Sequence, residues 1–212
     1  MGFYETKPAF RDALRPWARQ TLGIHPDVWT WVAVGVAGVA GALFLSSPRQ
    51  LGVLLLIPAL LFLRLLLNVF DGVVAQEAGL ASARGEAISE FADRLSDAVI
   101  LSGFAASGLG RARWAVAAII VVLLVSYVGI LGKAVGAGRQ YGGLMGKPDR
   151  MVVLIVACLA QYAVSRGWWA PPSVAGFHLT VFDWASVVII GLGVYTIGAR
   201  LQVILRGLSG HG

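Results

Sequence analysis

Long apolar runs alternate along this chain with short polar connectors. Six runs are mostly bounded by charged residues, proline or glycine, and they cover residues 28–46, 53–75, 87–107, 113–133, 150–165 and 182–205. About 20 apolar residues cross the hydrocarbon core of a bilayer as a helix. Inside lipid, runs of this length satisfy their backbone polar groups only as helices. The pattern therefore predicts an all-α integral membrane protein with six transmembrane helices.

The first 24 residues follow a different pattern. Phe10, Leu14 and Trp17 recur at helical spacing, opposite the basic residues of the same segment. Such a helix is typical of one that lies in the membrane interface with its cations toward anionic headgroups. The alternative is a basic flank that only orients the first span. We expect a single membrane domain over 1–212, with the interfacial helix at 1–24, the bundle at 28–205 and a short tail at 206–212.

Composition and charge agree with a membrane protein. Hydrophobic residues make up 58% of the chain and charged residues 13%, with a mean hydropathy of +0.77 and a net charge of +6. With a cytoplasmic N-terminus, eleven Lys and Arg residues fall on the inner side and four on the outer side, which predicts that both termini are cytoplasmic. Attraction to the inner leaflet accounts for this basic excess, so nucleic-acid binding is not expected.

Six of the eleven acids lie within residues 68–98, in and between the second and third runs. On a helix, Arg64, Asn68 and Asp71 share one face, and the next helix carries a second polar face. We expect the two faces to meet across a cavity. Carboxylates at membrane depth need cations, water or a metal. Their oxygens suit Mg²⁺ or Mn²⁺, whose shells are completed by water and phosphate. Glu77 and Glu86 have the simpler interpretation of solvated loop charges.

The spacing of these residues resembles a known signature. Asp71-Gly72-x-x-Ala75, then Gly85 and Asp93, is similar to the pattern D-x-x-D-G-x-x-A-R-x8-G-x3-D-x3-D of the CDP-alcohol phosphotransferase family. The stretch 24–30 resembles the start of that family's first span, and 146–150 resembles the segment before its fifth. The resemblance covers about residues 7–165.

The resemblance implies a metal-dependent transfer reaction. A CDP-linked alcohol, usually CDP-diacylglycerol, would give its phosphoryl-alcohol group to a small hydroxyl acceptor, and CMP would leave. It also implies Mg²⁺ or Mn²⁺ as one or two ions, membrane lipids as partners, a homodimer in the bacterial inner membrane, and a site open to the cytoplasm.

The resemblance also assigns roles to residues. It implies metal ligands at Asn68, Asp71, Ser89, Glu90 and Asp93, with Asp93 or Asp97 as general base. The CDP-linked substrate would lie against Asp71, Gly72, Ala75, Gln76, Arg84 and Gly85. The substrate phosphates would meet Lys133, Arg139, Lys147 and Arg150.

Three positions depart from the signature. Asn68 and Ser89 replace two aspartates, and Gln76 replaces the arginine. The metal site thus loses two negative charges, which lowers its affinity for hard cations unless Glu90 or Asp97 restores them. Asn68, Glu77, Glu90, Ser96 and Asp97 resemble a divergent bacterial branch of the family, but Gln76 and Ser89 depart even from that branch.

Other functions stay open at this point. A family member that binds nucleotide-lipid or cation without turnover, as a partner or regulatory subunit, would explain the departures. A membrane prenyltransferase would share Asn68-x-x-Asp71, and a transporter could use membrane-embedded acids as a proton relay. The sequence does not identify the acceptor. CMP release would separate an active CDP-alcohol phosphotransferase from these other functions.

Overall fold

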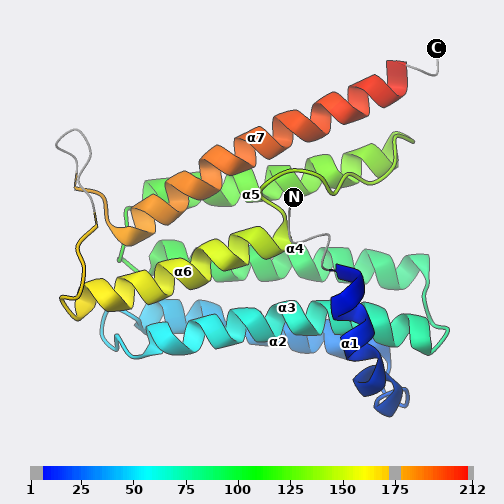
Figure 1. Ribbon diagram of the computed structural model, residues 1–212, viewed down its shortest axis with the longest axis horizontal. Helices are drawn as coiled ribbons and strands as arrows, with labels where there is room; N and C mark the ends of the chain where they lie inside the picture. The colour runs from blue at the N-terminus through cyan, green and yellow to red at the C-terminus, as the bar shows by residue number, and fades with distance from the viewer. Residues whose placement is uncertain (1–6, 172–177, 210–212) are drawn as a thin grey trace. The chain divides into compact units, whose positions relative to one another are not determined.

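The structure is a computed structural model that describes residues 7–171 and 178–209. All regular secondary structure in these ranges is helical (Figure 1). The helices are α1 (Lys7–Gln20), α2 (Pro26–Ser46), α3 (Val53–Glu77), α4 (Ala83–Ala106), α5 (Ala112–Ala134), α6 (Lys147–Ser165) and α7 (Val181–Ser209). The chain divides between Ala106 and Ser107 into two compact units, each described here by itself.

A helix covers each of the six predicted apolar runs. Within the described ranges, α2, α3, α5, α6 and α7 are long and apolar enough to cross a membrane. The prediction of an all-helical integral membrane protein is therefore confirmed. Helix α4 carries six charged side chains and does not meet the same criterion, so its crossing remains a proposal.

Unit 1 is held together by α2, which packs against both α3 and α4. Small residues let α2 and α4 approach at backbone distance: a Cβ on Gly103 would lie 2.7 Å from the Cα of Gly41, and a Cβ on Gly41 would lie 2.9 Å from the Val99 carbonyl oxygen. The Phe44 and Phe104 rings meet edge to face at 5.7 Å in the same interface. Close packing through small residues is the usual means of helix association in lipid.

We expect Gly103→Ala to lower the temperature at which the detergent-solubilised protein unfolds. The added methyl group has no space, and overpacking of this kind costs about 1–3 kcal/mol. Gly35→Ala in α2 is the matched control, because a Cβ there meets no heavy atom within 4 Å. Equal thermal unfolding of the two variants would contradict the close approach of α2 and α4.

Helix α1 is fixed on the carboxyl end of α3. Ala18 is fully buried against Val73 and Val74, and Figure 1 shows α1 crossing α3 near the end of that helix. Trp17, on the apolar face, stays 65% exposed. On the basic face, Arg11, Arg15 and Arg19 contact the end of α3, where Gln76 and Glu77 offer nearby oxygens, and the orientation of these cations toward headgroups stays a prediction.

A tight connection turns the chain from α3 into α4. Gly79 adopts φ = 67°, and the N–H groups of Leu80 and Gly79 donate to the carbonyls of Ala75 (2.9 Å) and Gln76 (3.2 Å). This is a Schellman motif, which glycine favours because the left-handed conformation strains other residues. The Ser82 hydroxyl then accepts the Gly85 N–H at 3.2 Å and caps α4. The polar faces of α3 and α4 are thus brought into register.

Unit 2 packs α7 against α5 and α6. The glycine-rich connector 135–146 is fastened to α7 by Thr196, whose hydroxyl oxygen accepts the N–H groups of Leu144 (3.1 Å) and Met145 (3.0 Å). Arg200 donates to the carbonyls of Val125 (2.6 Å) and Gly142 (2.8 Å). The buried guanidinium therefore joins α7 both to α5, through Val125, and to the irregular connector, where it supplies a donor to the Gly142 carbonyl.

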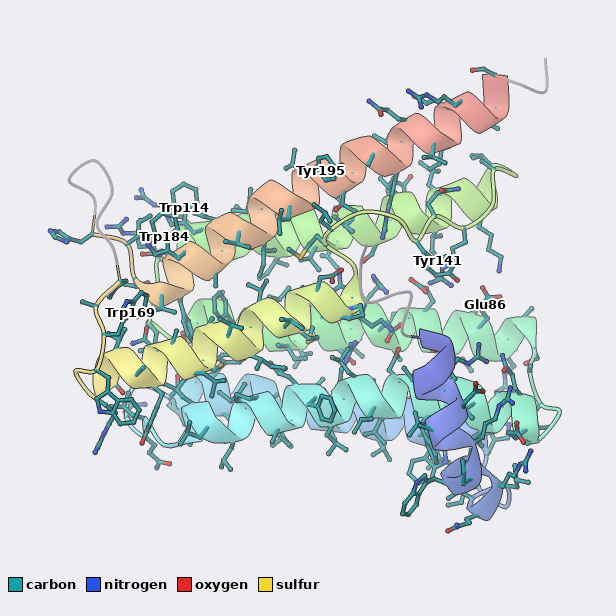
Figure 2. All side chains as sticks on the ribbon, in the orientation of Figure 1. Glu86, Trp114, Tyr141, Trp169, Trp184 and Tyr195 are labelled. Carbon is teal, nitrogen blue, oxygen red and sulfur yellow. The ribbon has the colours of Figure 1, made fainter. Side chains whose placement is uncertain are left out.

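The opposite end of unit 2 carries aromatic side chains. Figure 2 shows Trp114, Trp169 and Trp184 gathered where α5 and α7 begin and α6 ends. Trp169 is 49% exposed. Tryptophans concentrate at membrane–water interfaces, so this end fits the aromatic belt of a membrane protein.

Candidate active site

The signature positions of α3 and α4 face each other within unit 1. The Asn68 amide on α3 donates to Asp93 on α4. In the opposite sense, the Ser89 hydroxyl on α4 donates to Asp71 on α3 at 3.4 Å. Asp71 and Asp93 are the two signature aspartates that the chain retains. Each is thus hydrogen-bonded to the neutral residue that replaces a signature aspartate on the other helix. The predicted meeting of the two polar faces is confirmed by these crossed hydrogen bonds.

Asp71 has a further partner on α2. The Thr30 hydroxyl donates to Asp71 Oδ2 at 2.7 Å, and both residues are buried. A hydroxyl donor holds the carboxylate in one orientation without neutralising its charge. Side chains from two other helices, α2 and α4, therefore converge on Asp71.

Two arginines lie among the acids of α4. Arg64 is 1% exposed, and its Nη2 lies 3.4 Å from Asp93 Oδ1 and 3.5 Å from Asp97 Oδ1. Arg94 pairs with Glu90 at 3.1 Å and approaches Asp97 at 3.9 Å. In a buried ion pair of this kind, each charge offsets the desolvation cost that the other would have alone in an apolar surrounding. Asp97 is therefore enclosed between two cations.

The charges of this cluster do not cancel. We call Asp71, Glu90, Asp93 and Asp97 the acidic cluster; three of its four carboxylates, those of α4, contact the guanidiniums of Arg64 and Arg94. Two negative charges remain, which one divalent cation would balance. In the described ranges, no three Asp, Glu, His or Cys side chains converge closely enough to hold a metal by themselves. A cation would thus depend on the neutral oxygens of Asn68 and Ser89 and on substrate phosphates, a donor set that suits Mg²⁺ and Mn²⁺.

The predicted substrate-binding residues lie between this cluster and the C-terminal end of α3, which is expected to be cytoplasmic, and at the start of α4. Gly72 is exposed, and a Cβ there would meet nothing within 4 Å. Gln76 accepts a hydrogen bond from Arg11 of α1. Gly85 belongs to the cap of α4, and the neighbouring Arg84 is exposed. Glu86, predicted to be solvated, is also exposed, and Figure 2 labels it beside the ribbon of α4.

A cavity of about 300 Å³ lies elsewhere in unit 1, beneath α1. It is apolar and is lined by Leu14, Trp17, Gln20, Thr21, Trp29, Leu66, Leu67 and Phe70. The cavity expected between the two polar faces stays a prediction. At the level of Asn68 and Ser89, the crossed hydrogen bonds join the side chains of these two faces.

The four cations predicted for substrate phosphates belong to unit 2. Lys133 is exposed in the last turn of α5, and Arg139 lies 5.1 Å from the centre of the Tyr141 ring. Lys147 and Arg150 open α6; Arg150 is 1% exposed and its Nη1 donates to the Ser126 hydroxyl at 3.5 Å. The structure thus brings all four to the connector 135–146 or its flanking helix ends.

Sequence reasoning missed three residues of this chemistry. Thr30 lies in the segment 24–30 that resembles the start of the family's first span, so that resemblance could have indicated its place in the site. Arg11 and Arg200 were counted only as basic residues of the inner side. Their hydrogen bonds to Gln76 and to the connector depend on how helices pack, which residue spacing along one helix does not reveal.

Known proteins are similar to this chain in sequence and in fold, although no family model matches it. It is 27% identical over 155 residues to the inner membrane protein YnbA of Escherichia coli, covering 72% of this chain and 77% of that protein. It is 30% identical over 159 residues to the phosphatidylinositol phosphate synthase of Mycolicibacterium smegmatis, covering 71% of this chain and 69% of that enzyme.

A solved structure has the same fold. The crystal structure of Mycobacterium tuberculosis phosphatidylinositol phosphate synthase with CDP-DAG bound matches with a TM-score of 0.69 at 20% identity, covering 90% of this chain and 92% of that one. A second structure of the same enzyme is a complex with manganese and citrate. This likeness shows the fold, and the 30% identity over 71% of the chain to the Mycolicibacterium smegmatis enzyme shows that the chain belongs to the CDP-alcohol phosphotransferase family of membrane enzymes.

Proposed function

We propose that this protein transfers the phosphatidyl group of CDP-diacylglycerol to a small hydroxyl acceptor and releases CMP. The observation that carries the proposal is the pair of retained signature acids, Asp71 and Asp93, held opposite each other by crossed hydrogen bonds. The names of the relatives favour an inositol phosphate as the first acceptor to test. The basic residues Lys133, Arg139, Lys147 and Arg150 are proposed to bind its phosphate.

In the proposed reaction, Asp93 takes the proton of the acceptor hydroxyl. The acceptor oxygen then attacks the phosphorus that bears the diacylglycerol, and the bond to the CMP oxygen breaks with its electron pair leaving on CMP. A carboxylate fixed by Asn68 and Arg64 is oriented for this proton transfer. A divalent ion held by Asn68, Asp71, Ser89, Glu90 and Asp93 would neutralise charge on the diphosphate. Asp97, enclosed by Arg64 and Arg94, is proposed to position Arg64.

The proposal includes the membrane arrangement. Six crossings, α1 in the membrane interface, cytoplasmic termini and a site open to the cytoplasm are consistent with the distribution of basic residues. A multi-pass protein of the bacterial inner membrane accords with the relative YnbA. A single functional domain and a homodimer complete the proposal.

The decisive experiment measures CMP release from CDP-diacylglycerol by purified protein in detergent. The assay contains Mg²⁺ or Mn²⁺ and is run with inositol phosphate, glycerol phosphate and serine as separate acceptors. Metal-dependent release that requires an acceptor would establish the transferase, whereas its absence with every acceptor would refute the proposed reaction. Binding of CDP-lipid without release would favour the second candidate, a partner or regulatory subunit, which the neutral residues at positions 68 and 89 motivate.

We expect Ser89→Asp to tighten Mn²⁺ binding about tenfold, because an added carboxylate beside Asp71 raises the ligand charge of the site. Isothermal titration of the substrate-free protein measures the change. Ser82→Asp is the matched control, since it adds the same charge to the same helix while keeping an N-cap side chain for Gly85. An equal increase in both variants would show a nonspecific charge effect, and no increase in either would indicate that Glu90 already fills the position.

A further inference from the structure

Three arginines of α1 reach the carboxyl end of α3 with unequal partners. Arg15 and Arg19 lie 3.5 and 2.9 Å from the Glu77 carboxylate, so two cations share that acid. Arg11, one turn earlier on the same face, donates instead to the amide oxygen of Gln76. Among the described residues Arg11 takes part in no ion pair. Its charge is thus held in place by a neutral group and remains available to an anion.

The position of Arg11 relates it to the acidic cluster. Gln76 and Gly72 lie one turn apart on the same face of α3, a rise of roughly 6 Å along the axis. The exposed face at Gly72 is open, because a Cβ there would meet no heavy atom within 4 Å. Asp71 directly precedes this glycine. The Arg11 guanidinium therefore marks one end of an open strip of α3 whose other end adjoins the signature acids.

We propose that Arg11 is a substrate-binding residue that donates to the diphosphate of the nucleotide-linked lipid. The inference rests on the proposed function. A guanidinium has five N–H donors in a planar fork, so one bond to Gln76 leaves a pair for phosphate oxygens. The neutral amide at position 76 orients Arg11 without cancelling its charge, which a carboxylate would do. Helix α1 thereby contributes to the site directly.

The fixed position of α1 makes this role feasible. Ala18 is fully buried against Val73 and Val74, and Arg15 and Arg19 tie the same helix to Glu77. A rigid support limits the entropy lost when the side chain binds substrate. Arg19 also provides a matched control, since Arg15 remains on Glu77 when Arg19 is removed.

The test compares Arg11→Gln with Arg19→Gln in equilibrium binding of CDP-diacylglycerol, in neutral detergent with Mg²⁺ and without acceptor. We expect Arg11→Gln to weaken binding about tenfold, the usual scale of a charge-assisted hydrogen bond, and to raise KM more than it lowers kcat. Arg19→Gln should bind within about twofold of wild type, because it leaves the diphosphate contacts unchanged. Adding Gln76→Arg to Arg11→Gln should restore affinity, because the guanidinium then comes from α3.

Other outcomes would overturn the inference. Wild-type affinity in a folded Arg11→Gln variant, or failure of Gln76→Arg to rescue it, would exclude a contact with the diphosphate. An effect seen only in phosphatidylglycerol vesicles would show that Arg11 holds a bulk lipid headgroup. If the wild type binds CDP-lipid but releases no CMP, the proposed reaction fails while the binding comparison still decides the role of Arg11. If the wild type binds no CDP-lipid, both fail.

Discussion

Asp93→Asn is expected to abolish CMP release while the protein still folds. Asparagine has the same shape and keeps an oxygen that can accept the Asn68 amide, and Arg64 retains Asp97 as an ionic partner at 3.5 Å. The variant loses the proposed base and a negatively charged metal ligand together. General base catalysis alone contributes about 10²–10⁴-fold, so we expect kcat to fall by at least about a thousandfold.

The measurement pairs single-turnover CMP release with thermal unfolding in detergent. Asp183→Asn is the control, because Asp183 is also a buried aspartate. Its carboxylate accepts the N–H groups of Arg111 (2.7 Å) and Thr180 (3.1 Å) at the start of α7. That variant should unfold at lower temperature yet retain kcat per folded molecule. Normal turnover by Asp93→Asn would remove Asp93 from the reaction, and unfolding of the variant would assign it a structural role instead.

The sequence predicts the helices well because the physical constraint is strong. A run such as 53–75 has one way to satisfy its backbone in lipid, and α3 spans Val53–Glu77. The face shared by Arg64, Asn68 and Asp71 follows from helix geometry in the same way. The loop between α3 and α4 is short, so the meeting of Asn68 with Asp93 was also predictable.

Contacts that depend on packing between helices were not predictable from one sequence. The sequence did not indicate that Arg15 and Arg19, on the basic face of α1, contact Glu77. Thr30 reaches Asp71 only because α2 packs against α3. The burial of Arg64 could not be predicted from the sequence, since an arginine in an apolar run is as compatible with a water-filled cavity as with an enclosed ion pair.

Replacing that arginine is expected to have the largest effect on stability. Arg64→Met removes the 3.5 Å contact of Asp97, which is fully buried, and leaves the longer contact to Arg94 at 3.9 Å. Removing one partner of a buried ion pair costs about 3–5 kcal/mol because a charge remains unbalanced in an apolar surrounding. We expect the variant to accumulate poorly or to unfold at a clearly lower temperature in detergent. Unchanged unfolding would mean that water reaches the pair.

The double variant Arg64→Met, Asp97→Leu separates the two acids that the sequence proposed as bases. Apolar side chains of similar size remove both buried charges, and such exchanges are often neutral for stability. We therefore expect folding to recover relative to Arg64→Met. If Asp97 only positions Arg64, CMP release per folded molecule should match that of Arg64→Met within about tenfold, a barrier change of roughly 1.4 kcal/mol, because Arg64 is absent from both variants. A folded double variant that releases far less CMP per folded molecule than Arg64→Met would show that Asp97 takes part in the reaction, and Asp93 could no longer be regarded as the sole base.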